Sequence, residues 1–205
     1  METKIIPDII VGRMPLYLRA LQRMIEEGRR VTSSQELGER LGISAAQIRK
    51  DLSQFGEFGK QGTGYSIDYL AGQISQILKV DRVWEIIVVG AGDIGSAVAR
   101  YQGFTNRGFR VTMLFDNDPT KIGQQVGNFT VLDSKDLEEA IQKAGIQVAM
   151  IATPSPEAQA VADLLVKAGI RAILNYAPTS LNVPEGVQLQ YIDPVVHLQR
   201  MTYYL

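Results

Sequence analysis

The feature that most constrains the fold is an apolar run at residues 85–89 that leads directly into the turn Gly-Ala-Gly-Asp-Ile-Gly at 90–95. A helical pattern follows the turn, and a second apolar run at 110–115 ends at Asp116, 21 residues after Gly95. G-x-G-x-x-G alone is a weak signal, but this order of strand, turn, helix and acid-terminated strand is typical of a dinucleotide-binding unit. The sequence therefore predicts an α/β fold with a Rossmann-type, doubly wound parallel sheet.

The three glycines and the acid each have a role in such a unit. Gly90 allows the tight turn, Gly92 lets the backbone approach a pyrophosphate, and Gly95 lets the helix pack closely on the strand. The helix N-terminus then stabilises the anion. Asp116 would accept hydrogen bonds from both hydroxyls of an adenosine ribose and repel a 2′-phosphate, so NADH / NAD+ is the predicted cofactor. A glycine-rich turn that binds no dinucleotide is the alternative.

Alternating strands and helices continue after this unit. Strands are predicted at 148–152, 172–174 and 187–191, helices at 134–143 and 157–167, and a last helix at 195–204. Ligands bind at the carboxyl edge of such sheets, where Thr153 and Pro154 follow a strand. Two alternatives remain for these residues: they contact the cofactor, or they only end the strand. The cofactor-binding residues predicted here are Gly90, Ala91, Gly92, Asp93, Ile94, Gly95, Asp116, Asn117, Thr153 and Pro154.

Helical patterns dominate the chain before residue 80. The first predicted helix begins at Met14 and Pro15 and ends at Gly28, and its expected apolar face is Leu16, Tyr17, Ala20, Leu21, Met24 and Ile25. Two shorter helices begin at Ser33 and Ser44, each with Glu or Gln three residues later, which is a capping box. The second of them is expected to run to about Phe55. Two short capped helices separated by Gly42 predict a helix-turn-helix.

A glycine-rich segment at 56–64 predicts a tight hairpin with residues 65–67 as its return strand, followed by a helix capped by Asp68. Helix-turn-helix and hairpin together predict a winged-helix module. Arg and Gln near a helix start can contact base edges, and Lys can neutralise phosphates. The alternatives are a solvated helix face and a flexible linker. The predicted DNA-binding residues are Ser44, Gln47, Arg49 and Lys50, exposed on a helix where Ala46 and Ile48 are partly buried, and Lys60, Gly62 and Tyr65.

Composition excludes several classes of function. The chain has 205 residues, 45% hydrophobic and 21% charged, with a net charge of −1, no cysteine and a single histidine, His197. Disulfides, thiolate catalysis and metal clusters of Cys or His are therefore excluded. No run reaches the roughly 18 apolar residues of a membrane span, and no signal peptide is recognised, so a cytoplasmic location is expected. Residues 1–80 carry 11 basic and 9 acidic side chains, which permits DNA binding without requiring it.

The chain closely resembles the Rex family of redox-sensing transcriptional repressors over nearly its whole length. The resemblance implies a homodimer whose winged-helix domains bind a palindromic operator in double-stranded DNA, with release at a high NADH/NAD+ ratio. It also implies an exchanged C-terminal helix. The expected domains are a winged helix at 1–80, an NAD(H)-binding domain at 81–193 and the exchanged helix at 194–205. The matching segments are RKDL at 49–52, FGEFG at 55–59, GTGY at 62–65, YQGF at 101–104, FDNDP at 115–119, ILNYAP at 173–178 and the terminal YYL.

The resemblance further assigns a switch that links the cofactor to the DNA-binding domain, made of Arg19, Tyr101 and Asp193. NAD+ and NADH differ in charge only at the nicotinamide, and an Asp that can bond either an Arg or a Tyr near that ring could respond to the difference. Tyr101 and Asp193 thereby join the predicted cofactor-binding residues. From the residues alone, a static Arg19–Asp193 ion pair with Tyr101 as a packing residue is the alternative. Asp93 and Pro194 depart from some family members, which carry a basic and an aromatic residue there.

The predicted function is thus an NADH-responsive repressor and not an enzyme. One rival is an NAD-dependent oxidoreductase, but the residues after Val80 are nearly filled by the nucleotide-binding fold and leave no substrate domain. A second rival is a coenzyme A-binding module, since related sheets in acyl-CoA ligases also have glycine-rich first turns. Asp116 and the winged helix argue against that second rival.

Overall fold

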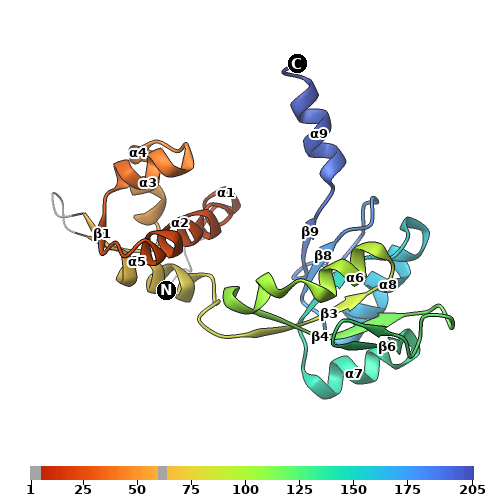
Figure 1. Ribbon diagram of the computed structural model, residues 1–205. Coiled ribbons are helices and arrows are strands. Elements are labelled where there is room, and N and C mark those ends of the chain that lie inside the picture. The colour runs from red at the N-terminus through yellow and green to blue at the C-terminus, as the bar shows by residue number, and fades with distance from the viewer. Residues whose placement is uncertain (1–5, 60–63) are drawn as a thin grey trace. The chain divides into compact units, whose positions relative to one another are not determined.

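The computed structural model describes residues 6–59 and 64–205. The chain forms two compact units, one up to Arg82 and one from Val83 (Figure 1). Each unit has its own buried hydrophobic residues. Of the predicted DNA-binding residues, Lys60 and Gly62 lie outside the described residues.

The first unit is mainly helical. Two of the side chains predicted for the apolar face of its second helix are in fact exposed, Leu16 at 46% and Ile25 at 39%. Met14 and Leu18 are buried in their place, because this helix packs mainly against two others and its buried side centres on Tyr17. The elements are α1 (Asp8–Val11), α2 (Met14–Glu26), β1 (Val31–Thr32), α3 (Ser34–Leu41), α4 (Ala45–Leu52), β2 (Tyr65–Ser66) and α5 (Ile67–Ile77).

The helix-turn-helix forms where the two capping serines predict it. The hydroxyl of Ser33 accepts a hydrogen bond from the backbone N–H of Glu36 at 3.1 Å, and Ser44 accepts from that of Gln47 at 3.2 Å. Each bond satisfies an N–H that the first turn of a helix leaves without a partner. Gly42 ends α3 in the left-handed region with φ +67°. The expectation that the next helix runs to Phe55 is wrong, because α4 ends at Leu52.

The small sheet of this unit differs from the expected hairpin. The return strand β2 pairs antiparallel with β1, so its partner precedes the helix-turn-helix and does not come from the glycine-rich segment. Asp68 does not cap the following helix, which begins one residue earlier. Ser66 holds the N-cap position of α5. Asp68 lies within the first turn, where a negative charge interacts favourably with the helix dipole.

The second unit is a seven-stranded sheet in the order β5-β6-β4-β3-β7-β8-β9. All its pairings are parallel except β5 with β6. The strands are β3 (Trp84–Val89), β4 (Phe109–Asp116), β5 (Gln125–Val126), β6 (Phe129–Asp133), β7 (Val148–Ile151), β8 (Ala172–Asn175) and β9 (Gln188–Tyr191). The helices are α6 (Asp93–Arg100), the 3-10 turns η1 (Gln102–Arg107) and η2 (Ser134–Asp136), α7 (Leu137–Ala144), α8 (Ser155–Ala168) and α9 (Pro194–Thr202).

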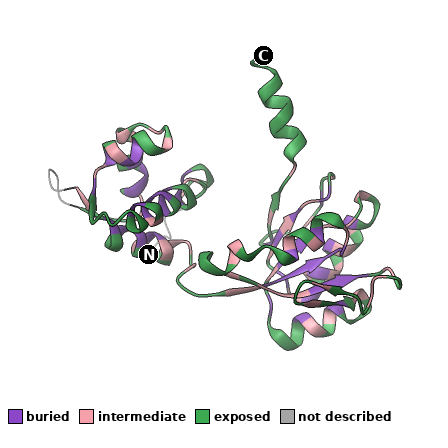
Figure 2. Cartoon of the chain, viewed as in Figure 1, coloured by how far each residue is buried: buried purple, intermediate pink, exposed green. Residues whose placement is uncertain are grey.

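Helices cover both faces of this sheet, as the doubly wound prediction requires. Successive side chains of a strand point to opposite faces. Ile86 and Val88 of β3 pack in the cluster that contains Ala99 of α6, whereas Ile87 and Val89 pack with residues of α7 and α8. The terminal helix α9 is different, since none of its residues is buried, and Figure 2 shows it in the colour of exposed residues along its length.

Candidate functional site

A cavity of about 520 Å³ lies at the carboxyl ends of β3, β4 and β7, next to the N-terminus of α6. It is lined by Val89, Gly90, Gly92, Asp93, Ile94, Asp116, Asn117, Asp118, Lys121, Ser134, Ala152, Thr153, Pro154, Glu157 and Val161. Most of the cofactor-binding residues predicted from the strand–turn–helix unit thus surround one cavity. Two of them, Ala91 and Gly95, are buried and do not line it.

The three glycines of the turn occupy different environments. Gly90 has a φ of +104°, which disfavours an L side chain, and a Cβ there would lie 2.5 Å from the carbonyl oxygen of Ala152. A Cβ on Gly95 would lie 1.7 Å from the carbonyl oxygen of Gly90. A Cβ on Gly92 would meet no protein atom within 4 Å, although Gly92 lines the cavity. The turn therefore needs glycine at 90 and 95 for packing, whereas Gly92 leaves open space on the cavity side.

Asp116 ties the end of β4 to the glycine-rich turn. Its Oδ2 accepts from the backbone N–H of Ala91 at 2.7 Å and from Nζ of Lys121 at 3.2 Å, and its Oδ1 accepts from the N–H of Asp118 at 2.9 Å. Burial by itself would raise the pKa of Asp116, but these hydrogen bonds together hold the pKa below its usual value. The side chain is therefore an ionised acceptor at neutral pH, at the edge of the cavity.

Several polar residues of the cavity were not predicted from the sequence, including Lys121, Asp118 and Glu157. A lysine five residues after the strand-terminal acid was the only signal for the Lys121–Asp116 pair. Within residues 6–59 and 64–205, the hydroxyl of Thr153 is the one buried side-chain polar atom without a hydrogen-bond partner. Buried polar atoms are almost always bonded, so this hydroxyl indicates a site that a polar ligand completes.

The three residues of the expected switch are not brought together within one unit. Arg19 lies on an exposed part of α2 in the first unit, whereas Tyr101 and Asp193 belong to the second, so their mutual contact stays a prediction. Tyr101 follows α6 and packs edge-on against Phe104. Asp193 is the N-cap of α9, accepting from the N–H of Val195 at 2.9 Å, and it lines a separate cavity of about 270 Å³. Neither Tyr101 nor Asp193 lines the larger cavity.

Four of the predicted DNA-contacting residues lie on α4 or at its N-cap, and the burial predicted for this helix needs correction at Gln47 and at Ala46. Ser44, Arg49 and Lys50 are exposed and Gln47 is half-buried, because the Gln47 amide nitrogen donates to Asp51 at 2.7 Å. Ala46, expected to be partly buried, is exposed, since the apolar contact of this helix is concentrated at Ile48, which is wholly buried.

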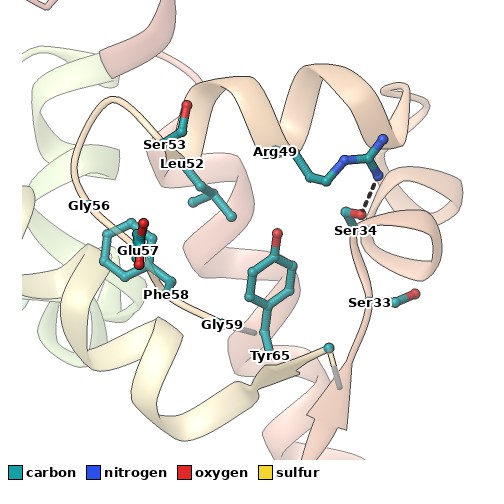
Figure 3. A pocket seen from close by; sticks show the side chains of 11 residues that line it. Ser33, Ser34, Arg49, Leu52, Ser53, Gly56, Glu57, Phe58, Gly59 and Tyr65 are labelled. Carbon is teal, nitrogen blue, oxygen red and sulfur yellow. Dashed lines mark hydrogen bonds between the residues drawn. The ribbon is translucent and has the colours of Figure 1, made fainter. Parts of the chain in front are cut away.

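Arg49 is held in place by the helix that precedes it. Its Nη1 donates to Oγ of Ser34 at 2.9 Å, a bond drawn as a dashed line in Figure 3. A hollow lies beside this contact, and Figure 3 shows the side chain of Tyr65 next to it. Burial raises the pKa of Tyr65, and the Arg49 charge partly offsets that shift. The hollow is lined by Ser33, Ser34, Arg49, Leu52, Ser53, Gly56, Glu57, Phe58, Gly59, Gly64 and Tyr65.

Among residues 6–59 and 64–205, no group of three or more His, Cys, Asp and Glu side chains could hold a metal ion. Over the same residues, no helix combines the length and hydropathy needed to cross a bilayer.

Two family models match the chain. The model described as "CoA binding domain" matches residues 81–179, and the model described as "Putative DNA-binding protein N-terminus" matches residues 5–53. The first covers most of the parallel sheet, and the second covers α1 to α4.

Curated relatives match almost the whole chain. A protein of Chloroflexus aurantiacus is 53% identical over 97% of this chain and 94% of its own length. One of Streptomyces coelicolor is 44% identical over 97% of this chain and 77% of its own length. Both are named "Redox-sensing transcriptional repressor Rex", which is the name of a regulator and not of an enzyme.

Solved structures give the same result. RSP in complex with beta-NAD+ and operator DNA is similar with a TM-score of 0.93 and 35% identity, covering 98% of this chain and 93% of that one. RSP in complex with beta-NADH is similar with a TM-score of 0.89 and 33% identity, covering 98% and 95%. RSP is described as a Rex-family repressor. With identities above 30% over nearly the full length, the chain belongs to the Rex family of redox-sensing transcriptional repressors.

Proposed function

We propose that this protein is a cytoplasmic repressor that binds a palindromic operator and leaves it when NADH binds, so that transcription follows the NADH/NAD+ ratio. The observation that carries the proposal is that one chain holds both a helix-turn-helix and a dinucleotide-sized cavity at the carboxyl edge of a parallel sheet. Support also comes from RSP, whose structures are described with NAD+ plus operator DNA and with NADH.

The cavity has the chemistry that a dinucleotide needs. The N-terminus of α6 and the open space at Gly92 suit a pyrophosphate, Asp116 suits the adenosine ribose, and the unpaired hydroxyl of Thr153 suits a polar group of the nicotinamide half. When bound, NAD(H) supplies a ring whose charge changes on reduction. We assign the remaining predicted cofactor residues, including Ala91, Gly95 and Asn117, to shaping this site.

The ribose contact of Asp116 has a geometric requirement. A carboxylate offers about four lone-pair sites, and three protein donors already bond Asp116. Binding both ribose hydroxyls therefore requires one donor to leave. Lys121 is the flexible one, since the other two donors are backbone N–H groups. We propose that the Lys121 ammonium moves aside when the dinucleotide binds.

Asp116→Ala should weaken binding of both NADH and NAD+ about 10- to 100-fold and reduce the discrimination against NADPH, because it removes an anionic acceptor and the repulsion of a 2′-phosphate. Fluorescence or calorimetric titration of the three dinucleotides measures this. Asp118→Ala is the matched control, since the Asp118 carboxylate lines the same cavity but bonds Thr120. Unchanged affinities in Asp116→Ala would refute the ribose assignment.

A palindromic operator fits a two-fold symmetric dimer. The apolar side chains of the α9 region are exposed, among them Leu198 at 58% and Met201 at 64%. Burying such a surface is favourable, so we propose that the exchanged C-terminal helix, residues 194–205, is covered in a homodimer. Residues 1–80 would then form the DNA-binding domain and residues 81–193 the NAD(H)-binding domain.

Changing Arg49 or Lys50 to Ala should weaken operator binding by about 1–3 kcal/mol and leave NADH affinity unchanged. We assign Arg49, which Ser34 orients, to contacts with base edges, and Lys50 to contacts with phosphate. Ser44, Gln47 and Tyr65 are assigned to the DNA surface beside Arg49. In the Lys50 variant, the slope of log Kd against log salt concentration should also fall by about one, because one phosphate contact is lost. Gel-shift titrations at several salt concentrations measure both effects, and Arg23→Ala on α2 is the control. A comparable loss of NADH affinity would contradict the domain assignment.

The function itself is tested by gel shift of a palindromic operator, selected from random DNA by this protein, with NADH, NAD+ or coenzyme A added. We expect NADH to release the DNA, NAD+ to leave it bound and coenzyme A to have no effect. An oxidoreductase would show turnover and no shift. A response to coenzyme A alone would favour the function named by the family model that matches residues 81–179.

A further inference from the structure

A fully buried carboxylate lies on α4, the helix assigned to DNA. The side chain of Asp51, in the last turn of α4, is 0% exposed. Its oxygens accept from Nε and Nη2 of Arg13 at 2.5 and 2.8 Å, from the hydroxyl of Tyr17 at 2.6 Å and from the amide of Gln47 at 2.7 Å. A buried charge is costly unless it is paired and fully hydrogen-bonded, so each of these donors is needed.

These contacts join two helices that are distant in sequence. Arg13 is the N-cap of α2 and Tyr17 lies in its first turn, whereas Asp51 is 38 and 34 positions further along the chain. α2 packs on α3, and α3 packs on α4. The Arg13–Asp51 pair is a direct tie between α2 and α4. Because it is bidentate, it constrains orientation as well as distance.

The tie is stable through the neutral pH range. Burial by itself would raise the pKa of Asp51, but the bonds from Arg13, Tyr17 and Gln47 hold that pKa below its usual value. Burial, together with the Asp51 charge, raises the pKa of the Tyr17 hydroxyl above its usual value. Asp51 therefore stays ionised as an acceptor, and Tyr17 keeps the proton that it donates.

α2 also carries Arg19, which is exposed two residues after Tyr17. We propose that Asp51 is a positioning residue, through which Arg13 and Tyr17 make α2 and α4 move as one piece, so that a displacement of α2 imposed at Arg19 reaches the DNA-contacting helix. This inference rests on the proposed function. The inference adds to that function a mechanical link inside the DNA-binding unit.

The test compares Tyr17→Phe and Asp51→Asn with the parent protein and with Ile74→Val, a core control on α5 outside the tie. The measured quantity is the coupling ratio, which is the operator Kd with saturating NADH divided by that with saturating NAD+. Melting temperature and NADH affinity are measured for every variant. Tyr17→Phe keeps the shape of the side chain, so the test remains valid where Asp51→Asn does not fold.

We expect Tyr17→Phe to reduce the coupling ratio roughly three- to tenfold and Asp51→Asn to reduce it more, with NADH affinity unchanged. Ile74→Val should keep the parent ratio, because general destabilisation does not remove the link. A parent-like ratio in folded Tyr17→Phe, or an equal loss in Ile74→Val, would overturn the positioning role alone. A parent protein whose operator affinity ignores NADH would overturn the proposed function, and the positioning role with it.

Discussion

Gly95→Ala should strongly weaken dinucleotide binding and lower the stability of the nucleotide-binding unit. The added Cβ would lie 1.7 Å from the carbonyl oxygen of Gly90 and 3.4 Å from Cβ of Ala152, so α6 must move away from the glycine-rich turn. Overpacking of this kind costs about 1–3 kcal/mol or more, and it displaces the helix N-terminus that faces the cavity. Thermal unfolding and NADH titration measure the two effects, and we expect at least a 100-fold loss of affinity.

Gly92→Ala is the matched variant, because its Cβ would meet no protein atom within 4 Å. It should therefore melt like the parent protein. Its NADH affinity should nevertheless fall at least about tenfold, since the methyl group would occupy the space through which the backbone approaches a pyrophosphate. Parent-like NADH affinity in Gly92→Ala would place the pyrophosphate elsewhere. Parent-like affinity in Gly95→Ala would show that α6 need not pack so closely.

The second unit could be predicted from sequence largely because its signals are local. A buried parallel strand is a continuous apolar run, and a strand that ends at Gly90 or Asp116 places that residue at the carboxyl edge. The predicted α/β class, with an N-terminal DNA-binding domain and a Rossmann-type sheet, is confirmed, whereas the exchange of the C-terminal helix stays a prediction. The two-residue strand β5 was not predicted, because two residues carry no periodicity, and its partner β6 was missed with it.

Long-range contacts were not predictable in the same way. Asp51 follows Arg49 and Lys50 in a polar stretch, which favours an exposed side chain, yet it is fully buried. Its burial depends on Arg13 and Tyr17, 38 and 34 residues away, and no local pattern contains that information. The pairing of β1 with β2 across the helix-turn-helix was missed for the same reason.

Partial exposure on a helix is also set by its neighbours. The period of α2 correctly predicted that Tyr17, Leu21 and Met24 are buried. It could not predict how wide the buried arc is, since that depends on how α3 and α5 pack against it. Leu16 and Ile25 lie outside the arc and Leu18 lies inside it.

Asp193→Ala should remove the response to NADH while leaving both ligands bound. In the parent protein, NADH is expected to weaken operator binding by a factor within the usual range of about 5 to 150. In the variant, the operator Kd should be the same with NADH as with NAD+, because the carboxylate that we propose exchanges Arg19 for Tyr101 is missing. Coupling is reciprocal, so operator DNA should also no longer change the Kd for NADH in the variant.

Asp193→Ser is the control that separates the switch from a second role of this residue. The Asp193 carboxylate caps α9 through the N–H of Val195, and loss of a cap costs about 1 kcal/mol. Serine keeps a capping oxygen but has no charge for Arg19. If the charge carries the signal, Asp193→Ser loses the NADH response as completely as Asp193→Ala does, although its helix is capped. A full NADH response in Asp193→Ser would show that Asp193 acts only by ordering α9, and the exchange of partners would then have to occur elsewhere.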